Sequence, residues 1–488
     1  MPGPAVGEPD PDWAAPSRTG LRDAAGGVLV LLVLGLAFRL IIAYLLPNSG
    51  FSVDIGAFRY WAENLASQGL GGFYDRPFFH DYTPGYLYVL WVVGKIGQLL
   101  GGGVGDLIKI PAILADVGLG YLVWSMAREL GASNRLAWIG AFLVIVNPVS
   151  WIDSTLWGQV DSVGTVVMLL ALRELWRDRA ERSAVLAVLA ALIKPQLGIL
   201  IPIVAVVVIR RALWPDGAFG EEGPPDERWK TRWERATRGP VRILTTGLAG
   251  LATAIVLALP FGLSFQGLIQ QIFKTAGGYP YVSVNAYNPW ALVTQAGNGV
   301  AANGLWICDA TVRPSGPIDI RIGDFVLWSS PASTLSCANG VMFGALPAVV
   351  VGAGLFLVAL AITLVLVGRR PDRRTMLVGL AVLAIAFFVL PTRVHERYLY
   401  PLIGVGAILA AVSFRWRIAY IAASIAMAAN LYAILTWVDL YKNPGIADWL
   451  GIRPLLASFW GIAVAAIVEV IVFIWAFAQL RDDRLEAL

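Results

Sequence analysis

The chain is poor in charge and has little cysteine or histidine. Asp, Glu, Lys and Arg make up 14% of its 488 residues, against about 25% in an ordinary soluble domain. Soluble domains of this total length would expose far more charge, so that class is excluded. Two cysteines are too few for a disulfide scaffold or a zinc ribbon. The net charge of +4 comes from scattered basic residues, which argues against a nucleic-acid partner.

Apolar residues, in contrast, are abundant. They form 57% of the sequence, the mean hydropathy is +0.68, and there are 19 Trp, 20 Phe and 15 Tyr. This many aromatic residues excludes a disordered chain. In a membrane the lipid-facing surface must be apolar as well as the core. The composition therefore predicts an all-α, polytopic membrane protein.

Long apolar runs divide the chain. The first, at 24–46, can cross a bilayer at roughly 1.5 Å per residue, and it is too long for a cleavable signal peptide. Further runs lie near 84–101, 107–127, 136–150, 158–174, 184–209, 242–262, 344–368, 375–391, 398–413, 417–437 and 454–479. We expect one transmembrane domain over 24–480, between a disordered cytoplasmic tail at 1–23 and a second cytoplasmic tail at 481–488.

The basic residues predict which loops face the cytoplasm. They gather around Arg128, at 173–182 and at 369–374, and in a longer basic loop at 210–241. These loops share one side of the membrane only if the run 84–101 does not cross. We therefore predict that 84–101 is a juxtamembrane helix in the outer interface.

The same parity requires the run 184–209 to cross twice. We place its break at Lys194-Pro195, because proline disfavours helix at the preceding residue and removes a backbone donor. The chain then crosses about 12 times with both termini in the cytoplasm. The large outer loops are 47–106, which holds juxtamembrane helices, and 263–343.

Two acids of the first outer loop could carry chemistry. Asp54 lies where an amphipathic helical pattern starts, just after the first apolar run. It is either the N-cap of that helix or a general base that takes the proton of an attacking hydroxyl, and the two roles are compatible. The turn at His80-Asp81 is either an ordinary polar loop or a second acidic wall beside Asp54.

A third cluster lies at Trp157-Gly158-Gln159-Val160-Asp161-Ser162. Asp161 falls one turn inside an apolar run, where a carboxylate needs a partner. Lys194, at the break in 184–209, is the first candidate partner, and Lys109 is another. Such a pair is either structural or functional, and buried pairs often add little net stability.

The turn before the run 398–413 is crowded with charge. Arg393, His395, Glu396 and Arg397 follow one another within five positions. The turn is either an ordinary loop or an anion site, because arginine presents a fork of donors that matches phosphate oxygens. Arg39, inside the first apolar run near its outer end, would add a further positive charge.

The two cysteines, Cys308 and Cys337, both fall in the outer loop 263–343. Because oxidation is permitted outside the cytoplasm, we predict a disulfide between them. The alternative is two independent buried cysteines. The stretch between them has little core of its own, with strand-like runs at 318–322 and 324–328.

These motifs together resemble those of the membrane-embedded C-type glycosyltransferases (GT-C fold), and most closely bacterial relatives of the GPI mannosyltransferases. The resemblance covers about 24–440. It is carried by Asp54, by the run 157–162, by Lys194-Pro195-Gln196 and by the run 395–398. It implies a polyprenyl-phosphate sugar donor, with mannose as the sugar, and inverting transfer to a glycolipid, glycan or protein. The active site would lie on the extracytoplasmic face of the cell membrane.

The resemblance also assigns roles to residues. Asp54 matches the catalytic base by position, and Lys109 matches a basic residue that contacts the donor phosphate. No second acid follows Asp54 in a DxD pattern, so neither a metal nor a cofactor is expected. The residues expected to contact substrate are Arg39, His80, Asp81, Lys109, Trp157, Gln159, Asp161, Lys194, Gln196, Arg393, His395, Glu396 and Arg397.

Two other classes are compatible with charged residues in apolar runs. A transporter or flippase for lipid-linked sugars would more often show inverted repeats and polar residues on both faces, whereas the motifs here gather on one side. A non-catalytic membrane scaffold could keep the same fold without needing Asp54. Sugar transfer by an Asp54 variant separates the scaffold from the enzyme.

Overall fold

The computed structural model describes residues 18–46, 50–214, 239–293, 307–316, 318–322, 325–330, 336–437 and 446–481. Most of the predicted N-terminal tail and of the basic loop 210–241, and the predicted tail after Arg481, lie outside the described residues. The first helix, α1 (Arg18–Leu45), begins at Arg18 rather than at 24, so residues 18–23 of the predicted tail are helical.

The described chain is mostly helical, as predicted. The first half contains α2 (Ser52–Gln68), α3 (Pro84–Leu99), α4 (Ile110–Glu129), α5 (Asn134–Ile145), α6 (Pro148–Trp151), α7 (Asp161–Trp176), α8 (Ala180–Ile193) and α9 (Leu200–Leu213). The second half contains α11 (Val241–Ala258), α12 (Phe265–Gly277), α13 (Ala348–Arg369), α14 (Arg373–Val389), α15 (Pro401–Val412), α16 (Phe414–Leu435), α18 (Arg453–Leu456) and α19 (Phe459–Gln479).

Seven helical segments are long and apolar enough to cross a membrane, in the part of the chain that the structure describes. They contain α1, α4, α9, α11, α13, α16 and α19. An eighth span results if α5 and the segment 148–157, which is bent from α5 by 41°, count as one. These helices support a multi-pass membrane protein, but the predicted number of about 12 crossings is not confirmed.

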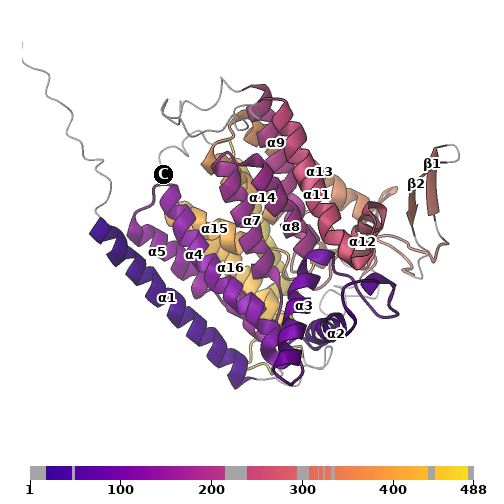
Figure 1. Ribbon diagram of the computed structural model, residues 1–488, viewed down its shortest axis with the longest axis horizontal. Coiled ribbons are helices and arrows are strands. Elements are labelled where there is room, and N and C mark those ends of the chain that lie inside the picture. The colour runs from indigo at the N-terminus through magenta and orange to yellow at the C-terminus, as the bar shows by residue number, and fades with distance from the viewer. Residues whose placement is uncertain are drawn as a thin grey trace, which may run out of the picture.

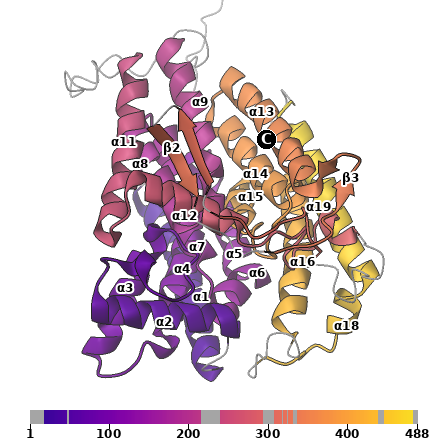
Figure 2. The same ribbon diagram turned by 90° about the vertical axis from the view of Figure 1, so that its right-hand side faces the viewer.

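The difference in number has a structural origin. The predicted runs 158–174, 375–391 and 398–413 and the first half of 184–209 are the helices α7, α14, α15 and α8, which have only 12 to 17 residues. Helices α14 and α15 are buried along almost their whole length. They form the centre of the protein and are enclosed by other helices (Figure 2).

Small residues let the helices around α15 approach closely. A Cβ atom on Gly140 of α5 would lie 2.9 Å from the Cβ atom of Ala411 on α15. The side chains of α15 are almost all apolar, and those of its neighbours α4, α5, α14 and α16 pack against them. In a membrane, helix association depends on close van der Waals packing, which small residues at the contact allow.

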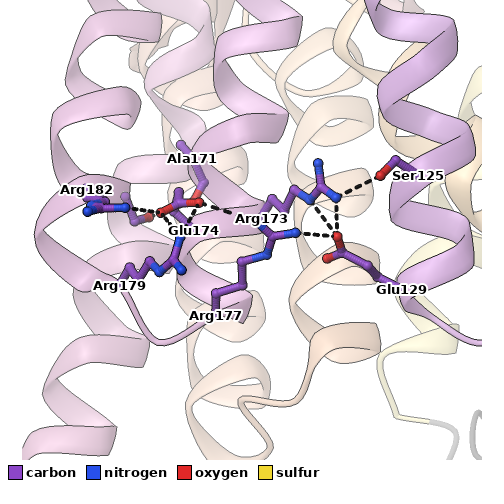
Figure 3. A network of polar contacts seen from close by, with 9 residues as sticks. Ser125, Glu129, Ala171, Arg173, Glu174, Arg177, Arg179 and Arg182 are labelled. Carbon is purple, nitrogen blue, oxygen red and sulfur yellow. Dashed lines mark hydrogen bonds and ion pairs between the residues drawn. The ribbon is translucent and has the colours of Figure 1, made fainter. Parts of the chain in front are cut away.

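Arginine-rich loops meet at one end of the bundle, which we call the basic end (Figure 3). Arg173 in the last turn of α7 and Arg177 directly after this helix both donate to Glu129 at the end of α4. Arg211 and Arg242 both pair with Asp178. The loops predicted to be cytoplasmic therefore lie together, although they are distant in sequence.

The opposite end of the same helices carries the predicted site residues, and we call it the site end. Helices α4 and α7 begin there, at Lys109 and Asp161, and α8 ends there, before Lys194. Helix α1 also contacts the start of α4. The segment 47–106, with α2 and α3, therefore leaves and rejoins the bundle at one end (Figure 1), which is the geometry that the loop parity requires.

Strands occur only in the segment before α13, among the described residues. β1 (Ile318–Ile322) and β2 (Phe325–Ser330) form an antiparallel hairpin that projects from the helical body (Figure 1). β3 (Met342–Phe343) and β4 (Leu346–Pro347) form a second, shorter one. The prediction of an all-α fold thus needs correction in this segment, where the strand-like runs do pair.

The disulfide expected from the sequence is present in this segment. Cys308 and Cys337 are bonded, and their Cα atoms are 5.8 Å apart. The backbone of Cys337 also exchanges two hydrogen bonds of 2.9 Å with Val312. The disulfide therefore lies beside the backbone pairing of Val312 with Cys337, in the segment that precedes α13.

Candidate active site

Asp54 lies in the first turn of α2 and lines a cavity at the site end. The helix begins at Ser52 with Phe51 as its N-cap, so Asp54 is not the N-cap that one interpretation assigned. Its Oδ2 atom accepts hydrogen bonds from Trp157 Nε1 at 3.0 Å and from Gln159 Nε2 at 2.6 Å. Among the described residues, none donates a hydrogen bond to Oδ1. Two neutral donors thus orient the carboxylate and leave one oxygen for a proton.

Both donors come from an irregular segment between α6 and α7. One turn of π-helix, η3 (Ile152–Trp157), ends at Gly158, whose φ of 82° lies in the left-handed region. A Cβ atom at this position would lie 2.1 Å from Ile55 Cδ1 on α2. Position 158 therefore requires glycine for its backbone conformation and for the close approach of α2. Single π-turns of this kind are frequent at functional sites.

Asp161, at the start of α7, is buried and pairs with Lys194. The Lys194 Nζ atom lies 2.6 Å from Asp161 Oδ1 and 2.7 Å from Oδ2, and Gln196 Nε2 donates to Oδ1 at 3.1 Å. Helix α8 ends at Ile193, Lys194 is extended, and Pro195 begins the 3-10 turn η4 (Pro195–Ile199). The helix therefore breaks at Lys194-Pro195, as predicted from the proline. Of the two predicted partners of Asp161, it is Lys194 that pairs with it.

Arg397 joins these two groups of residues. Its Nη1 atom lies 3.7 Å from Asp54 Oδ2, and its Nε atom lies 3.9 Å from Asp161 Oδ2. Nη1 also donates to Glu396 Oε1 at 2.5 Å. The guanidinium carbon lies 5.8 Å from the centre of the Trp157 ring, which is within the range of a cation–π contact. One cation is thus shared among three carboxylates.

The cavity has a volume of about 270 Å³ and combines charged groups with aromatic walls. Its charged lining consists of Asp54, Asp81, Lys194, Glu396 and Arg397. Its aromatic lining consists of Phe51, Phe58, Trp61, Phe79, Tyr82, Tyr279, His395 and Tyr398. Mainly apolar walls with a few convergent polar groups are typical of a small-molecule site.

Burial shifts the proton affinity of three groups around the cavity. Burial and the negative charge of Asp54 raise the pKa of Asp81 to about 6. Burial also raises the pKa of Glu396 above its ordinary value. Burial and the charge of Arg397 hold the pKa of His395 well below its ordinary value, so the ring is neutral at pH 7. Two of the acids thus keep a proton more readily than exposed carboxyl groups do.

Most of the predicted site residues come together. A single network of hydrogen bonds and ion pairs contains Asp54, Trp157, Gln159, Asp161, Lys194, Gln196, Glu396 and Arg397. Asp81 and His395 line the cavity next to this network. Four residues of the network do not line the cavity themselves, and these are Trp157, Gln159, Asp161 and Gln196. Four further residues predicted to contact substrate do not line it either, and these are Arg39, His80, Lys109 and Arg393.

Arg39 belongs to a separate buried network inside the bundle. Its Nε atom donates to Asp116 Oδ2 at 2.7 Å, and its Nη2 atom donates to Ser150 Oγ at 2.9 Å. Asp116 also accepts from Ser154 at 2.6 Å and from Tyr400 at 3.0 Å. The expectation that Arg39 adds positive charge to the phosphate site is corrected, because Asp116 neutralises it.

Arg393 holds the outer segment rather than facing the cavity. Its Nε and Nη2 atoms donate to the two carboxylate oxygens of Asp309 at 2.7 and 3.1 Å, and Thr392 donates to the same carboxylate at 2.7 Å. Asp309 directly follows Cys308. Arg393, which was predicted to bind phosphate, therefore joins the 392–397 turn to the disulfide-bonded segment through Asp309.

Lys109 and His80 are also buried outside the cavity. Lys109 Nζ lies 3.9 Å from Asp106 Oδ1, and the Lys109 Cγ atom would lie 3.6 Å from a Cβ atom built on Gly158. The His80 ring contacts the carbonyl of Tyr74 at 2.6 Å among aromatic side chains. Burial and the charge of a nearby lysine lower the pKa of His80 to about 4, so it is neutral at pH 7. Neither side chain is placed to contact a ligand in the cavity.

Sequence reasoning missed the partners of the two arginines and part of the cavity lining. Asp116 is a single acid within an apolar run, a signal that could have identified it as a partner for Arg39. Asp309 and the cavity residues Tyr279 and Asn285 fall in the outer loop 263–343, where no pattern indicated them. Within the described ranges, no group of three or more His, Cys, Asp or Glu side chains is arranged to hold a metal ion.

Comparison with known proteins gives a limited likeness. No family model matches the chain, and no curated protein matches it in sequence. The apo structure of the oligosaccharyltransferase of Archaeoglobus fulgidus is similar with a TM-score of 0.40 and 13% identity. The structure of the same organism's oligosaccharyltransferase AglB with an inhibitory peptide and a dolichol-phosphate gives 0.34 and 14%. In both cases 93% of this chain is covered, and it spans 56% of the length of the oligosaccharyltransferase chain. TM-scores in this range do not by themselves establish a shared fold.

Proposed function

We propose that the chain is a membrane glycosyltransferase of the GT-C type. It transfers a hexose, which we take to be mannose, from a polyprenyl-phosphate donor to a glycolipid, glycan or protein. One observation carries the proposal: the Asp54 carboxylate, oriented by Trp157 and Gln159, lines the same cavity as Arg397 and Lys194. A general base and cations for a phosphate thus share one site.

The proposed reaction is a single displacement with inversion. The acceptor hydroxyl oxygen attacks the anomeric carbon on the face opposite the phosphate, and Asp54 takes the hydroxyl proton. As the new C–O bond forms, the bond from the anomeric carbon to the phosphate oxygen breaks. Its electron pair leaves with the lipid phosphate, which is a stable anion and needs no proton from a general acid.

We assign the donor phosphate to Arg397 and Lys194 instead of Arg393 and Lys109. Both assigned cations line the cavity, and charged donors in a site with little water stabilise negative charge that develops on a leaving group. Both also lie among carboxylates, with which a phosphate must compete. Because burial raises the pKa of Asp81 to about 6, this acid is protonated below that pH and then does not repel the phosphate.

We place the site end on the extracytoplasmic face of the membrane. The reason is the basic end, because loops rich in arginine are typical of the cytoplasmic side. The seven candidate spans, α5 and the four short helices α7, α8, α14 and α15 then make 12 crossings. Of the short helices, α14 and α15 are buried along almost their whole length.

The test is transfer from a labelled donor by the purified protein. Polyprenyl-phosphate mannose, glucose and galactose, each with a radiolabelled sugar, are incubated with the protein and with membranes that supply acceptor. We expect transfer from the mannose donor, and a loss of about 10²-fold or more for Asp54→Asn. Asp75→Asn is the matched control, because Asp75 is an exposed acid of the same outer segment and should keep full activity.

A second variant separates donor binding from the base. Arg397→Gln should raise the KM for the donor more than the KM for the acceptor, because the guanidinium group is assigned to the donor phosphate and to no part of the acceptor. If Asp54→Asn turned over like the wild type, Asp54 would not be the base. If no labelled donor lost its sugar to any product in the presence of the wild-type protein, the glycosyltransferase proposal would fail.

A further inference from the structure

A second cavity opens at the basic end, between the last turns of α13 and the end of α19. Its volume is about 590 Å³, which lies within the range of about 300–1,000 Å³ common for small-molecule sites. Its apolar wall includes Ile362, Val365 and Leu366 of α13 and Leu480 after α19. Arg369, Arg370 and Arg481 complete the lining. We call it the α13–α19 groove.

The groove is continuous with the apolar outer surface of the protein. Val365 is 53% exposed, and Val358, two turns earlier on the same helix, is 60% exposed. Both helices that border the groove are among the candidate membrane spans. Next to the groove, Gly379 of α14 lies against Val367 of α13 and near Leu480. In a membrane, the exposed apolar wall would face lipid chains.

The arginines of the groove differ from the other arginines of the basic end. Around α7 the guanidinium groups are matched by carboxylates: Arg173 and Arg177 pair with Glu129, and Arg179 pairs with Glu174 (Figure 3). Arg369 and Arg481, in contrast, form no ion pair with any carboxylate among the described residues. The nearby acid Asp372 is engaged as the N-cap of α14. Within the described ranges, the charges of Arg369 and Arg481 are therefore not matched by a carboxylate.

From this we infer that the α13–α19 groove binds an anionic phospholipid of the surrounding leaflet. The phosphate would accept hydrogen bonds from the guanidinium groups, whose fork of donors suits phosphate oxygens. One acyl chain would lie along Val365 and Leu480. Basic pockets between helices at the cytoplasmic surface are known to hold anionic head groups. The site is separate from the cavity of Asp54, so the inference stands independently of the proposed function.

The experiment compares lipid binding by three forms of the full chain. The protein is delipidated in detergent, phosphatidylglycerol or phosphatidylcholine is titrated in, and native mass spectrometry counts the bound lipids. The wild type should bind phosphatidylglycerol in preference to phosphatidylcholine. The triple variant Arg369→Gln, Arg370→Gln and Arg481→Gln should bind phosphatidylglycerol about tenfold or more weakly, because each arginine near a lipid surface contributes measurably to attraction.

A matched variant removes the same charge from the same end. Arg177→Gln, Arg179→Gln and Arg182→Gln together also lower the net charge by three, but these residues lie outside the groove, so binding should change less than about twofold. Equal losses in the two triple variants would show a general surface effect and overturn the inference. Unchanged binding in the groove variant would do the same.

A further variant tests the acyl chain and keeps every charge. Val365→Trp fills the groove, and it should weaken phosphatidylglycerol while each guanidinium group remains. Soluble glycerophosphoglycerol, which has the head group without chains, should not displace the bound lipid. Full affinity in Val365→Trp would place the ligand outside the groove. Displacement by the soluble head group would show that the acyl chain does not contribute to binding, and it would overturn the assignment to a phospholipid.

Discussion

The buried pair of Asp161 and Lys194 allows stability and function to be separated. The Asp161 side chain is 0% exposed and that of Lys194 is 7% exposed. Replacing Lys194 with Met leaves the carboxylate with one hydrogen bond from Gln196 and with Arg397 at 3.9 Å. Breaking a buried pair by removing one partner costs about 3–5 kcal/mol. Because two partners remain, we expect the lower end of this range, about 3 kcal/mol.

The double variant Lys194→Met, Asp161→Leu removes both charges. Buried pairs replaced by apolar residues are often no less stable than the original, so we expect it to recover at least about 2 kcal/mol of the loss. Neither variant should transfer sugar, because Lys194 is assigned to the donor phosphate. Free energies of unfolding would be measured by chemical denaturation in mixed detergent micelles, with Asp161→Leu alone completing the cycle.

Two results would refute the reasoning. If Lys194→Met lost less than about 1 kcal/mol, the carboxylate would not depend on its ammonium partner. If the double variant were as unstable as the single one, the loss would come from packing of the lysine side chain rather than from an unpaired charge.

Three further predictions concern pH, the disulfide and topology. The pKa of Asp81 is raised to about 6, so this group loses its proton and adds negative charge to the cavity as the pH rises through 6. The value of kcat/KM for the donor should fall over this interval, and Asp81→Asn should remove the fall. An unchanged pH profile in the variant would exclude Asp81 as the titrating group. The double variant Cys308→Ser, Cys337→Ser should lose about 3 kcal/mol of unfolding free energy, because the open loop gains chain entropy when the protein unfolds. Denaturation of the variant and of the oxidised wild type measures this difference, and equal stability would show that the crosslink is dispensable. A cysteine at the exposed position of Ser133 should resist membrane-impermeant maleimide in intact cells and react after lysis, and labelling before lysis would reverse the proposed orientation.

Local chemistry explains which parts of the site could be predicted from the sequence. Proline fixes the break after Lys194 whatever surrounds it, and an acid one turn inside an apolar run demands a nearby cation. The pairing of Asp161 with Lys194 follows from these two facts, and the cluster around Asp54 follows from the grouping of polar residues on one face.

The errors concern arginines whose partners lie far away in the sequence. Arg39 and Asp116 are 77 positions apart, and Arg393 and Asp309 are 84 positions apart. Both arginines were assigned to a phosphate site because a guanidinium group presents a fork of donors that matches phosphate oxygens. The fold brings a neutralising acid to each, and only tertiary packing could show this. The number of crossings stays a prediction for a related reason, since hydropathy does not distinguish lipid from the buried protein interior that surrounds α14 and α15.

Gly158 has a consequence for the way variation in this chain should be interpreted. The residue has no side chain to contact a substrate, yet its φ of 82° would strain any other residue, and a side chain there would also press on Ile55 of the helix that carries Asp54. It would also shift the backbone on either side, which presents Trp157 and Gln159. In a saturation mutagenesis screen scored by growth or product, position 158 would therefore tolerate as few substitutions as Asp54, the proposed base. Directed evolution toward new sugars should leave it fixed and vary the aromatic wall instead.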